Sequence, residues 1–252
     1  MSHQAEKVEN FLIQAILDGT YPPGSTLPGE RELAGRLGVT RLNVQRVIQR
    51  MAQDGWLSTG ERYATRVNNF WTGGNLAVLS ALATNLENDA LATFVVELLE
   101  ARRIVAPVYT MQAVGRNPLE VVRCLAENPQ ENATAFSGFD VELHLALARL
   151  SGNKIYPLLL NSFAALSHKA GLLYFSFPQC REASRHFYQK LLEAAVAREA
   201  RSAYRVTLAA MKESCRLWQE ISRDAGNFGG EVTCGGGTAG EMIPGNMSSM
   251  MR

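Results

Sequence analysis

The chain has 252 residues, of which 46% are hydrophobic and 19% are charged, as in ordinary soluble globular proteins. Its formal net charge of +1 excludes a polycationic protein that wraps DNA, so any contact with nucleic acid must come from a local basic cluster. No apolar stretch approaches the roughly 20 residues that cross a bilayer, so we expect no membrane insertion.

Cysteine usage and the first residues favour a cytoplasmic protein. The four cysteines have no metal-ligand spacing: Cys124, Cys180, Cys215 and Cys234. The N-terminus lacks the basic region and apolar run of a secretory signal. We therefore expect reduced thiols and a cytoplasmic location.

Residues 1–67 show the pattern of three short helices followed by a hairpin. The first helix has apolar residues at helical spacing and stops at Gly19: Val8, Phe11, Leu12, Ala15 and Ile16. The second helix is expected over 29–37 and the third over 41–54, with Thr40 as its cap. Two β-compatible runs, 56–58 and 64–67, flank Gly60. This order predicts a winged helix-turn-helix domain for DNA.

The third helix has one apolar and one polar face. Its apolar stripe is Val44, Val47, Ile48 and Met51. On the opposite face, Arg46 is suited to guanine, Gln45 or Gln49 to adenine, and Leu42 to a thymine methyl. Such a face can also be merely solvated, so the context of the helix decides between the two interpretations.

The remainder of the chain differs in kind. Residues 68–75 are predicted to be a linker anchored by Phe70 and Trp71. Residues 76–224 are predicted to form about six helices and no strands, a separate helical domain with prolines between helices or in their first turns. Residues 225–252 are rich in glycine and lack an apolar period, so we expect a disordered tail.

Several motifs resemble the DNA-binding signature of the GntR family of bacterial regulators. They are Pro-Pro-Gly at 22–24, Leu-Pro-Gly-Glu-Arg-Glu-Leu-Ala at 27–34 and Leu-Gly-Val-Thr-Arg at 37–41. Asp-Gly-Trp-Leu at 54–57 and Thr-Arg-Val-Asn-Asn-Phe-Trp at 65–71 are similar to the fatty-acid-responsive FadR branch. The resemblance extends from residue 5 to about residue 222. It implies a mostly α protein with an all-α C-terminal bundle of FadR type, binding palindromic operator DNA as a homodimer.

The same resemblance suggests which residues contact DNA. Arg31, Thr40 and Arg41 fall where FadR proteins touch the operator. Gln45 stands where the family has an arginine, and the wing tip Glu61-Arg62-Tyr63 replaces a His-Gly-Lys tip. The predicted DNA contacts are Arg31, Thr40, Arg41, Leu42, Asn43, Gln45, Arg46, Gln49 and Arg62.

For the effector, the resemblance implies a long-chain acyl-CoA held in a tunnel between helices, with no cofactor. The predicted ligand-binding residues are Arg102, His144, Phe163, Tyr174, Met211, Glu213, Ser214 and Trp218. Two of them depart from the family: Met211 replaces a glycine and His144 replaces an aromatic tunnel residue. A structural alternative is that Arg102 only pairs with Glu97 or Glu100, and that the aromatic residues belong to the core.

A different branch of the family binds a divalent metal and a small carboxylate. Asp140 and His144, one helical turn apart, have the spacing of its first two ligands. The later ligand positions hold Tyr188 and about Met211, and an isolated Asp/His pair is more often a salt bridge. We therefore expect no metal, and keep the small carboxylate as the alternative effector.

Two other classes of protein are weighed against a regulator. The chain has no Gly-x-Ser-x-Gly elbow, no phosphate-cradling glycine loop and no cysteine matched with a histidine, so we expect no enzyme. A purely structural dimerisation protein is disfavoured by the polar outward face of the third helix.

Overall fold

A computed structural model describes the chain except residues 1, 61–62, 87 and 225–252. The predicted contact Arg62 and the predicted glycine-rich tail therefore lie outside the described residues. Contacts divide the chain into two compact units, the first ending at Asn85 and the second beginning at Leu86. Over the described residues, none of the helices has the length and apolarity needed to cross a membrane.

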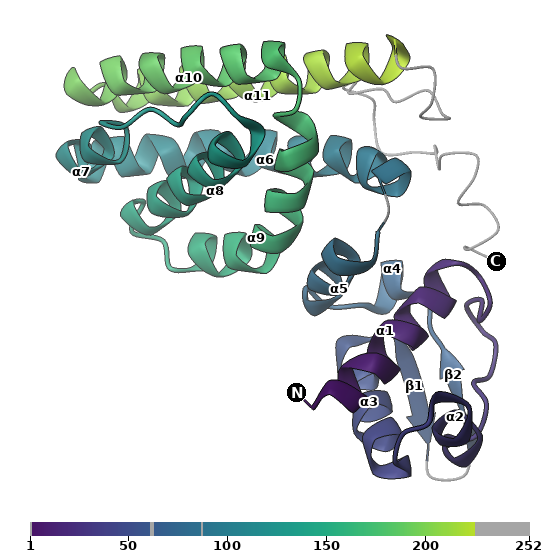
Figure 1. Ribbon diagram of the computed structural model, residues 1–252. Helices are drawn as coiled ribbons and strands as arrows, with labels where there is room; N and C mark the ends of the chain where they lie inside the picture. Colours follow the sequence, from purple (N-terminus) through teal and green to yellow (C-terminus); the bar gives the residue numbers. More distant parts are fainter. Residues whose placement is uncertain (1, 61–62, 87, 225–252) are drawn as a thin grey trace. The chain divides into compact units, whose positions relative to one another are not determined.

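The first unit is a winged helix (Figure 1). Its elements are α1 (His3–Leu17), α2 (Glu30–Leu37), α3 (Arg41–Asp54), β1 (Leu57–Gly60), β2 (Tyr63–Val67), α4 (Phe70–Gly73) and α5 (Ala77–Asn85). In the antiparallel hairpin, Leu57 lies opposite Val67 and Ser58 lies opposite Arg66. This order of elements confirms the predicted winged helix-turn-helix.

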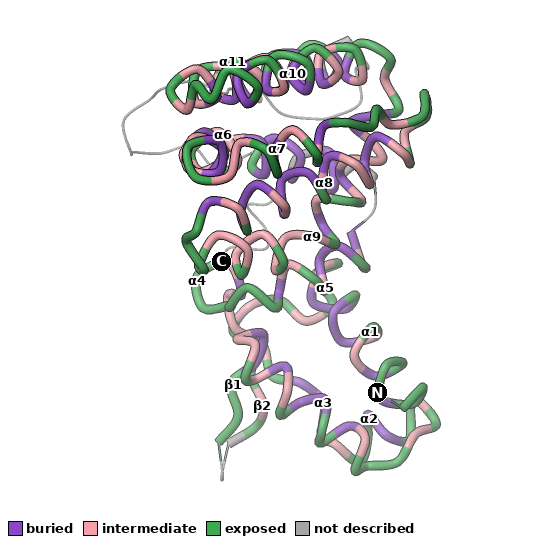
Figure 2. Tube along the Cα trace, turned by 90° about the vertical axis from the view of Figure 1, so that its left-hand side faces the viewer, coloured by how far each residue is buried: buried purple, intermediate pink, exposed green. Residues whose placement is uncertain are grey.

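Local signals fix both ends of α3. The Thr40 hydroxyl accepts a hydrogen bond from the backbone N–H of Asn43 at 3.3 Å, which caps the first turn. Gly55 ends the helix in the left-handed conformation, with φ of +91°. The predicted apolar stripe is fully buried, and Figure 2 shows buried positions along α3 alternating with exposed ones.

Residues 68–75, expected to be a linker, pack against the winged helix. The Phe70 ring lies 4.5 Å from the Trp56 ring, centroid to centroid. The backbone N–H of Asn75 donates to the Asp54 carbonyl at 3.0 Å. A Cβ added to Gly55 would lie 2.3 Å from the Gly73 carbonyl oxygen, so α4 passes directly over the end of α3. Aromatic burial therefore keeps this segment within the first unit.

The second unit is all helical over its described residues, as predicted. It contains α6 (Asn88–Arg116), α7 (Pro118–Cys124), α8 (Ala133–Leu150), α9 (Ile155–Tyr174), α10 (Pro178–Val196) and α11 (Ala200–Asp224). The α6 helix packs against α8, α9 and α11, and α10 lies along α11 (Figure 1). One proline departs from the expectation, because α6 continues through Pro107 instead of ending there. Packing of α6 on three helices offsets the backbone hydrogen bond that this proline lacks.

Two contacts hold α9 in place. At the crossing of α8 and α9, a Cβ added to Gly171 would lie 2.5 Å from the Ser137 hydroxyl oxygen, so glycine allows the two helices to approach closely there. Near it, the Lys169 ammonium donates to the Leu86 carbonyl at 2.6 Å. These contacts bring the C-terminal part of α9 close to α8 and to the residues just before α6.

Candidate DNA-binding face and effector cavity

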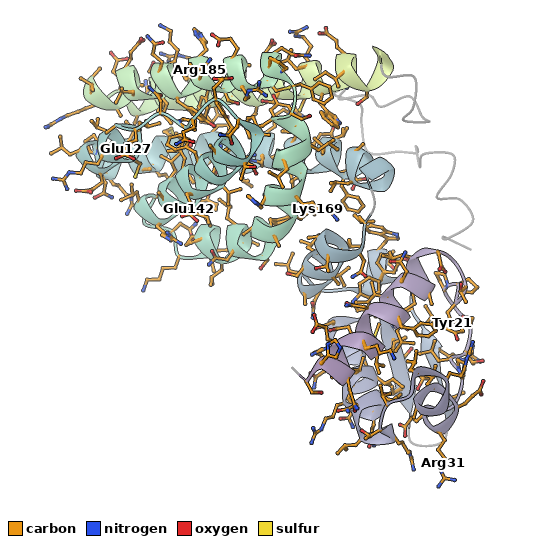
Figure 3. All side chains as sticks on the ribbon, viewed as in Figure 1. Tyr21, Arg31, Glu127, Glu142, Lys169 and Arg185 are labelled. Atoms are coloured by element: carbon orange, nitrogen blue, oxygen red, sulfur yellow. The ribbon has the colours of Figure 1, made fainter. Side chains whose placement is uncertain are left out.

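The outward face of α3 carries the predicted base-reading side chains. Leu42, Gln45, Arg46 and Gln49 are exposed, while the apolar stripe between them is buried. On the neighbouring α2, Arg31 is also exposed, and its side chain extends away from the ribbon (Figure 3). The arrangement presents long polar side chains from two helices to solvent, as reading of the major groove requires.

Three of the predicted DNA contacts also have partners within the chain. The Arg41 guanidinium donates to the Glu30 carboxylate at 2.8 Å, which ties α3 to α2. The Asn43 amide donates to the Gln4 side chain at 2.7 Å, which ties α3 to α1, and Thr40 caps α3. These residues orient the recognition helix whether or not they also touch DNA.

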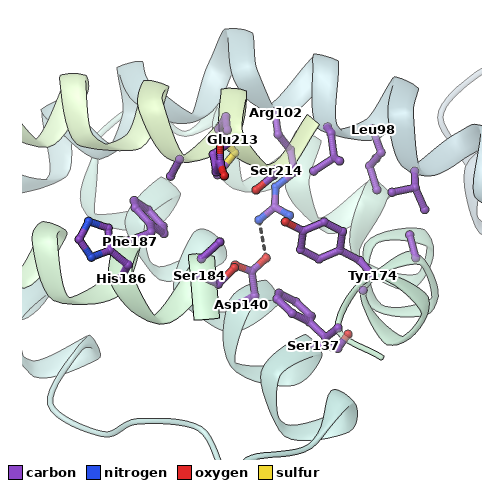
Figure 4. A pocket seen from close by; sticks show the side chains of 18 of the residues that line it. Leu98, Arg102, Ser137, Asp140, Tyr174, Ser184, His186, Phe187, Glu213 and Ser214 are labelled. Atoms are coloured by element: carbon purple, nitrogen blue, oxygen red, sulfur yellow. Dashed lines mark hydrogen bonds and ion pairs between the residues drawn. The ribbon is translucent and has the colours of Figure 1, made fainter. Parts of the chain in front are cut away.

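The second unit contains a partly open cavity of about 650 Å³ (Figure 4). Side chains of α6, α8, α9, α10 and α11 form its wall. Part of the wall is apolar, with Val95, Leu98, Leu99, Ala170 and Phe175. Another part carries Arg102, Asp140, Tyr174, Ser184 and Ser214, whose polar groups approach one another in the close-up. The cavity can accommodate a molecule that is partly apolar and partly hydrogen-bonding.

The structure gathers most of the predicted ligand residues in this cavity. Its wall includes Arg102, Tyr174, Met211, Glu213 and Ser214.

The other three predicted ligand residues, His144, Phe163 and Trp218, lie outside the lining. Trp218 is buried behind it, where its indole N–H donates to the Ala92 carbonyl at 3.1 Å and its ring packs 6.1 Å from Tyr174. Its contact with the cavity is therefore through Tyr174.

A buried polar network lies along one side of the cavity. We use this name for Arg102 and Tyr109 of α6, Asp140 and His144 of α8, and Tyr188 of α10. The Arg102 guanidinium donates to Asp140 Oδ2 at 2.6 Å, and the Tyr188 hydroxyl donates to Asp140 Oδ1 at 3.1 Å. The Tyr109 hydroxyl lies 2.6 Å from His144 Nδ1, and His144 Nε2 lies 3.7 Å from Asp140 Oδ1. Three helices are thus joined through one carboxylate.

Charge pairing decides the ionisation of the network. Burial, the largest influence, would raise the pKa of Asp140, but the Arg102 charge, His144 and the hydrogen bonds from Arg102 and Tyr188 together hold that pKa below its ordinary value. Burial would lower the pKa of Arg102, yet the Asp140 charge raises it. For His144, burial and then the Arg102 charge lower the pKa to about 3, against an opposing effect of Asp140. At neutral pH the network therefore contains one cation, one anion and a neutral imidazole.

Sequence reasoning found only part of this network. The spacing of Asp140 and His144 was evident, but not that Arg102 from α6 would pair with Asp140 instead of Glu97 or Glu100. Tyr109 belongs to no recognisable motif, and a tyrosine in an apolar helix is usually part of the core, so the sequence does not single it out. Ser137, Ser184, His186 and Lys190 also line the cavity without having been predicted.

Both units match known families. Residues 4–67 match the family of bacterial regulatory proteins called gntR, and residues 68–227 match the FadR C-terminal domain. The chain belongs to the GntR family. Its FadR-type C-terminal domain contains the cavity and the buried polar network, so the predicted fold class is confirmed.

Curated relatives of this GntR-family chain match most of its length. A fatty acid metabolism regulator protein of Shewanella frigidimarina is 37% identical over 226 residues, covering 87% of this chain and 92% of the relative. A protein of the same name from Edwardsiella ictaluri is 37% identical, covering 83% and 88% respectively. Since the relatives are regulators and the family is regulatory, the chain is not an enzyme.

Among solved structures, one described as Lar, which controls expression of the agr system of Listeria monocytogenes, has a TM-score of 0.51. It is 15% identical and covers 88% of this chain and 99% of its own. At that identity the likeness shows the fold alone.

The metal alternative is poorly suited to the geometry of this GntR-family chain. Within the described ranges, no group of three or more His, Cys, Asp or Glu side chains is placed to hold a metal ion. The Arg102 guanidinium already lies against Asp140, where a metal cation would have to bind. Tyr188 stands at one of the later ligand positions, but its hydroxyl donates a hydrogen bond to the same carboxylate, whereas a metal ligand offers a lone pair to the cation.

Proposed function

We propose that this chain regulates transcription of fatty-acid metabolism genes, binding operator DNA as a homodimer whose affinity changes when a long-chain acyl-CoA occupies the cavity. A regulator of this kind meets its operator in the cytoplasm. The observation that carries the proposal is the cavity itself, which combines an apolar wall with a buried, charged network in a FadR C-terminal domain.

The cavity suits both parts of an acyl thioester. Apolar side chains of α6 and α9 offer a surface for a hydrocarbon chain, and each buried methylene contributes roughly 0.8 kcal/mol. Arg102 and Ser214 supply hydrogen-bond donors to anionic or carbonyl oxygens. The Tyr174 hydroxyl is buried beside Ser214 and Cys180 and has no hydrogen bond of regular geometry among the described residues, so it is available to a ligand.

The DNA half of the proposal rests on the first unit. Its α3 presents Arg46, Gln45 and Gln49 on one solvent-facing side, backed by a buried apolar stripe. A homodimer places two such helices on the two halves of a palindromic site. The proposal predicts a native mass of twice the 27.6 kDa chain.

The deciding experiment is native mass spectrometry of the purified chain, with and without oleoyl-CoA, with metal analysis of the same sample. We expect a dimer that binds one oleoyl-CoA per chain and carries no stoichiometric metal. We also expect the dimer to release an operator duplex when oleoyl-CoA is added. Absence of an adduct, or a bound metal ion with a small carboxylate, would overturn the acyl-CoA assignment.

A matched pair of variants locates the binding site. Arg102→Gln removes the cationic side chain that pairs with Asp140 in the cavity wall, and we expect it to weaken oleoyl-CoA binding. Arg149→Gln removes an exposed arginine of α8 that does not line the cavity, and should leave binding unchanged. Equal effects of the two substitutions would mean that the ligand binds elsewhere.

A further inference from the structure

The two ionisable groups of the buried polar network that pair with each other both line the cavity. Arg102 and Asp140 belong to the wall, and the close-up draws their ion pair inside it (Figure 4). His144 and Tyr109 lie behind this wall, outside the lining. A ligand that enters the cavity can therefore contact the ion pair directly, and it affects the imidazole through that pair.

Asp140 depends on Arg102 for its charge. Its carboxylate is buried, with Arg102 as cation and the Tyr188 hydroxyl as a neutral donor. A buried carboxylate that loses its cation is strongly destabilised, because a neutral donor does not replace the lost charge. If a phosphate or carboxylate of an effector draws Arg102 away, Asp140 needs another positive partner.

His144 is the neighbouring group that can provide one. Its Nε2 is buried, lies 3.7 Å from Asp140 Oδ1 and has no hydrogen-bond partner among the described residues. The Tyr109 hydroxyl lies at Nδ1, so a hydroxyl that donates there leaves the proton of the neutral ring on Nε2, facing the carboxylate.

Burial, the larger influence, and the Arg102 charge both oppose protonation of the imidazole, and Arg102 is the one of the two that a ligand can move. From α6 the imidazole is faced by Arg102 and Tyr109, from its own α8 by Asp140, and from α10 by the apolar Phe187 ring, while the Tyr188 hydroxyl of α10 donates to Asp140. Burial raises the pKa of both tyrosines, so they remain neutral. The Arg102 charge lowers the pKa of His144 and the Asp140 charge raises it. Moving Arg102 towards a ligand removes the opposing charge and leaves the favourable one.

We propose that an anionic effector which engages Arg102 makes His144 take up a proton from solvent, so that the imidazolium replaces Arg102 as the cation beside Asp140. The inference rests on the proposed function, because it requires an anionic ligand in the cavity. No bond other than the N–H bond is made, and the proton comes from the buffer. Effector affinity therefore increases as the pH falls.

Isothermal titration calorimetry with oleoyl-CoA tests this directly. Measured at about pH 6 in two buffers with different ionisation enthalpies, the binding heat gives the number of protons taken up. We expect uptake by the unsubstituted chain, and affinity that rises by up to about tenfold for each pH unit of acidification while a whole proton is bound.

His144→Gln is the matched variant, because glutamine keeps a hydrogen-bonding side chain but cannot ionise. Protonation of the ligand's own phosphates occurs equally in both proteins, so the difference in proton number between them belongs to His144. We expect His144→Gln to lose that share, His144→Phe to lose it as well, and His186→Gln, at an exposed histidine of the cavity wall, to retain it.

The outcomes separate the two proposals. Failure of the unsubstituted chain to bind oleoyl-CoA overturns the proposed function. Binding without proton uptake overturns only this inference. Equal uptake by the unsubstituted chain and both His144 variants also overturns it, since the proton would then go to the Asp140 carboxyl or to the ligand.

Discussion

Arg46 is the residue through which the first unit is most directly tested. Its side chain is exposed on α3, one residue before the buried Val47, and no part of the predicted core depends on it. If Arg46 contacts a guanine with two hydrogen bonds, Arg46→Ala costs about 1–3 kcal/mol of operator binding and relaxes preference at one base pair. A binding-selection assay with both proteins measures this.

The control is Arg149→Ala, which removes an equal charge from α8 in the second unit. It should leave operator preference intact. Unchanged base preference in Arg46→Ala would assign this arginine to phosphate contacts instead.

His144 makes the stability of the second unit depend on pH even without a ligand. Its pKa is about 3 in the folded chain, below the ordinary value of 6.5, because burial disfavours the charged ring. Between these values the unfolded chain binds a proton that the folded chain does not, so stability falls as the pH decreases through this window. The slope approaches about 1.4 kcal/mol per pH unit well below the upper value.

Urea unfolding of the unsubstituted chain and of His144→Gln, at neutral pH and at about pH 5, measures this contribution. We expect the variant to lose less stability on acidification. Parallel pH profiles would show that the pKa of His144 is not lowered by folding.

At the scale of elements, the end of α3 depends on a position that is suited only to glycine. Gly55 has φ of +91°, and a Cβ there would lie 2.3 Å from the Gly73 carbonyl oxygen. We expect Gly55→Ala to combine backbone strain of about 1–3 kcal/mol with a clash against α4.

Gly38→Ala separates the two effects, because Gly38 also has a positive φ, of +64°, but open space around its Cα. Thermal unfolding should show a clearly larger decrease in the melting temperature for Gly55→Ala. Equal decreases would mean that α4 moves aside without cost.

The elements of the first unit could be predicted closely from the sequence because capping residues and glycines mark the ends of its helices. Thr40 and Gly55 bound α3 at the residues expected, and Gly38 ends α2. In contrast, 68–75 contains turn residues typical of a linker, and its packing on Trp56 is a tertiary effect that local patterns do not record. The continuation of α6 through Pro107 has the same cause.

The candidate cavity was predictable only as a set of residues. Tyr174, Met211 and Ser214 were identified through family resemblance, and they do share one wall. Trp218 and His144 lie behind that wall and not in it. Their position depends on how five helices pack, which a single sequence does not specify.

For the whole molecule, the proposed function couples DNA binding by one unit to ligand binding by the other. Thermodynamic linkage makes such coupling reciprocal, whatever route it takes through the chain. If oleoyl-CoA weakens operator binding by a given factor, a saturating operator duplex weakens oleoyl-CoA binding by the same factor.

Fluorescence anisotropy with labelled duplex, and calorimetry with and without unlabelled duplex, give the two factors independently. A typical coupling is about 5- to 150-fold. An effect of the ligand on DNA binding, with no effect of DNA on ligand binding, would contradict the two-site proposal.

The ion pair between Arg41 and Glu30 has a consequence for how DNA binding responds to salt. Each phosphate neutralised by a protein cation releases condensed counterions, and the number released sets the slope of log affinity against log salt. Arg41 already has a carboxylate at 2.8 Å, so its approach to a phosphate brings little net positive charge with it. The number of arginines on this surface therefore overestimates the number of counterions released on binding. The affinity for operator DNA should decline less steeply with salt than that number suggests.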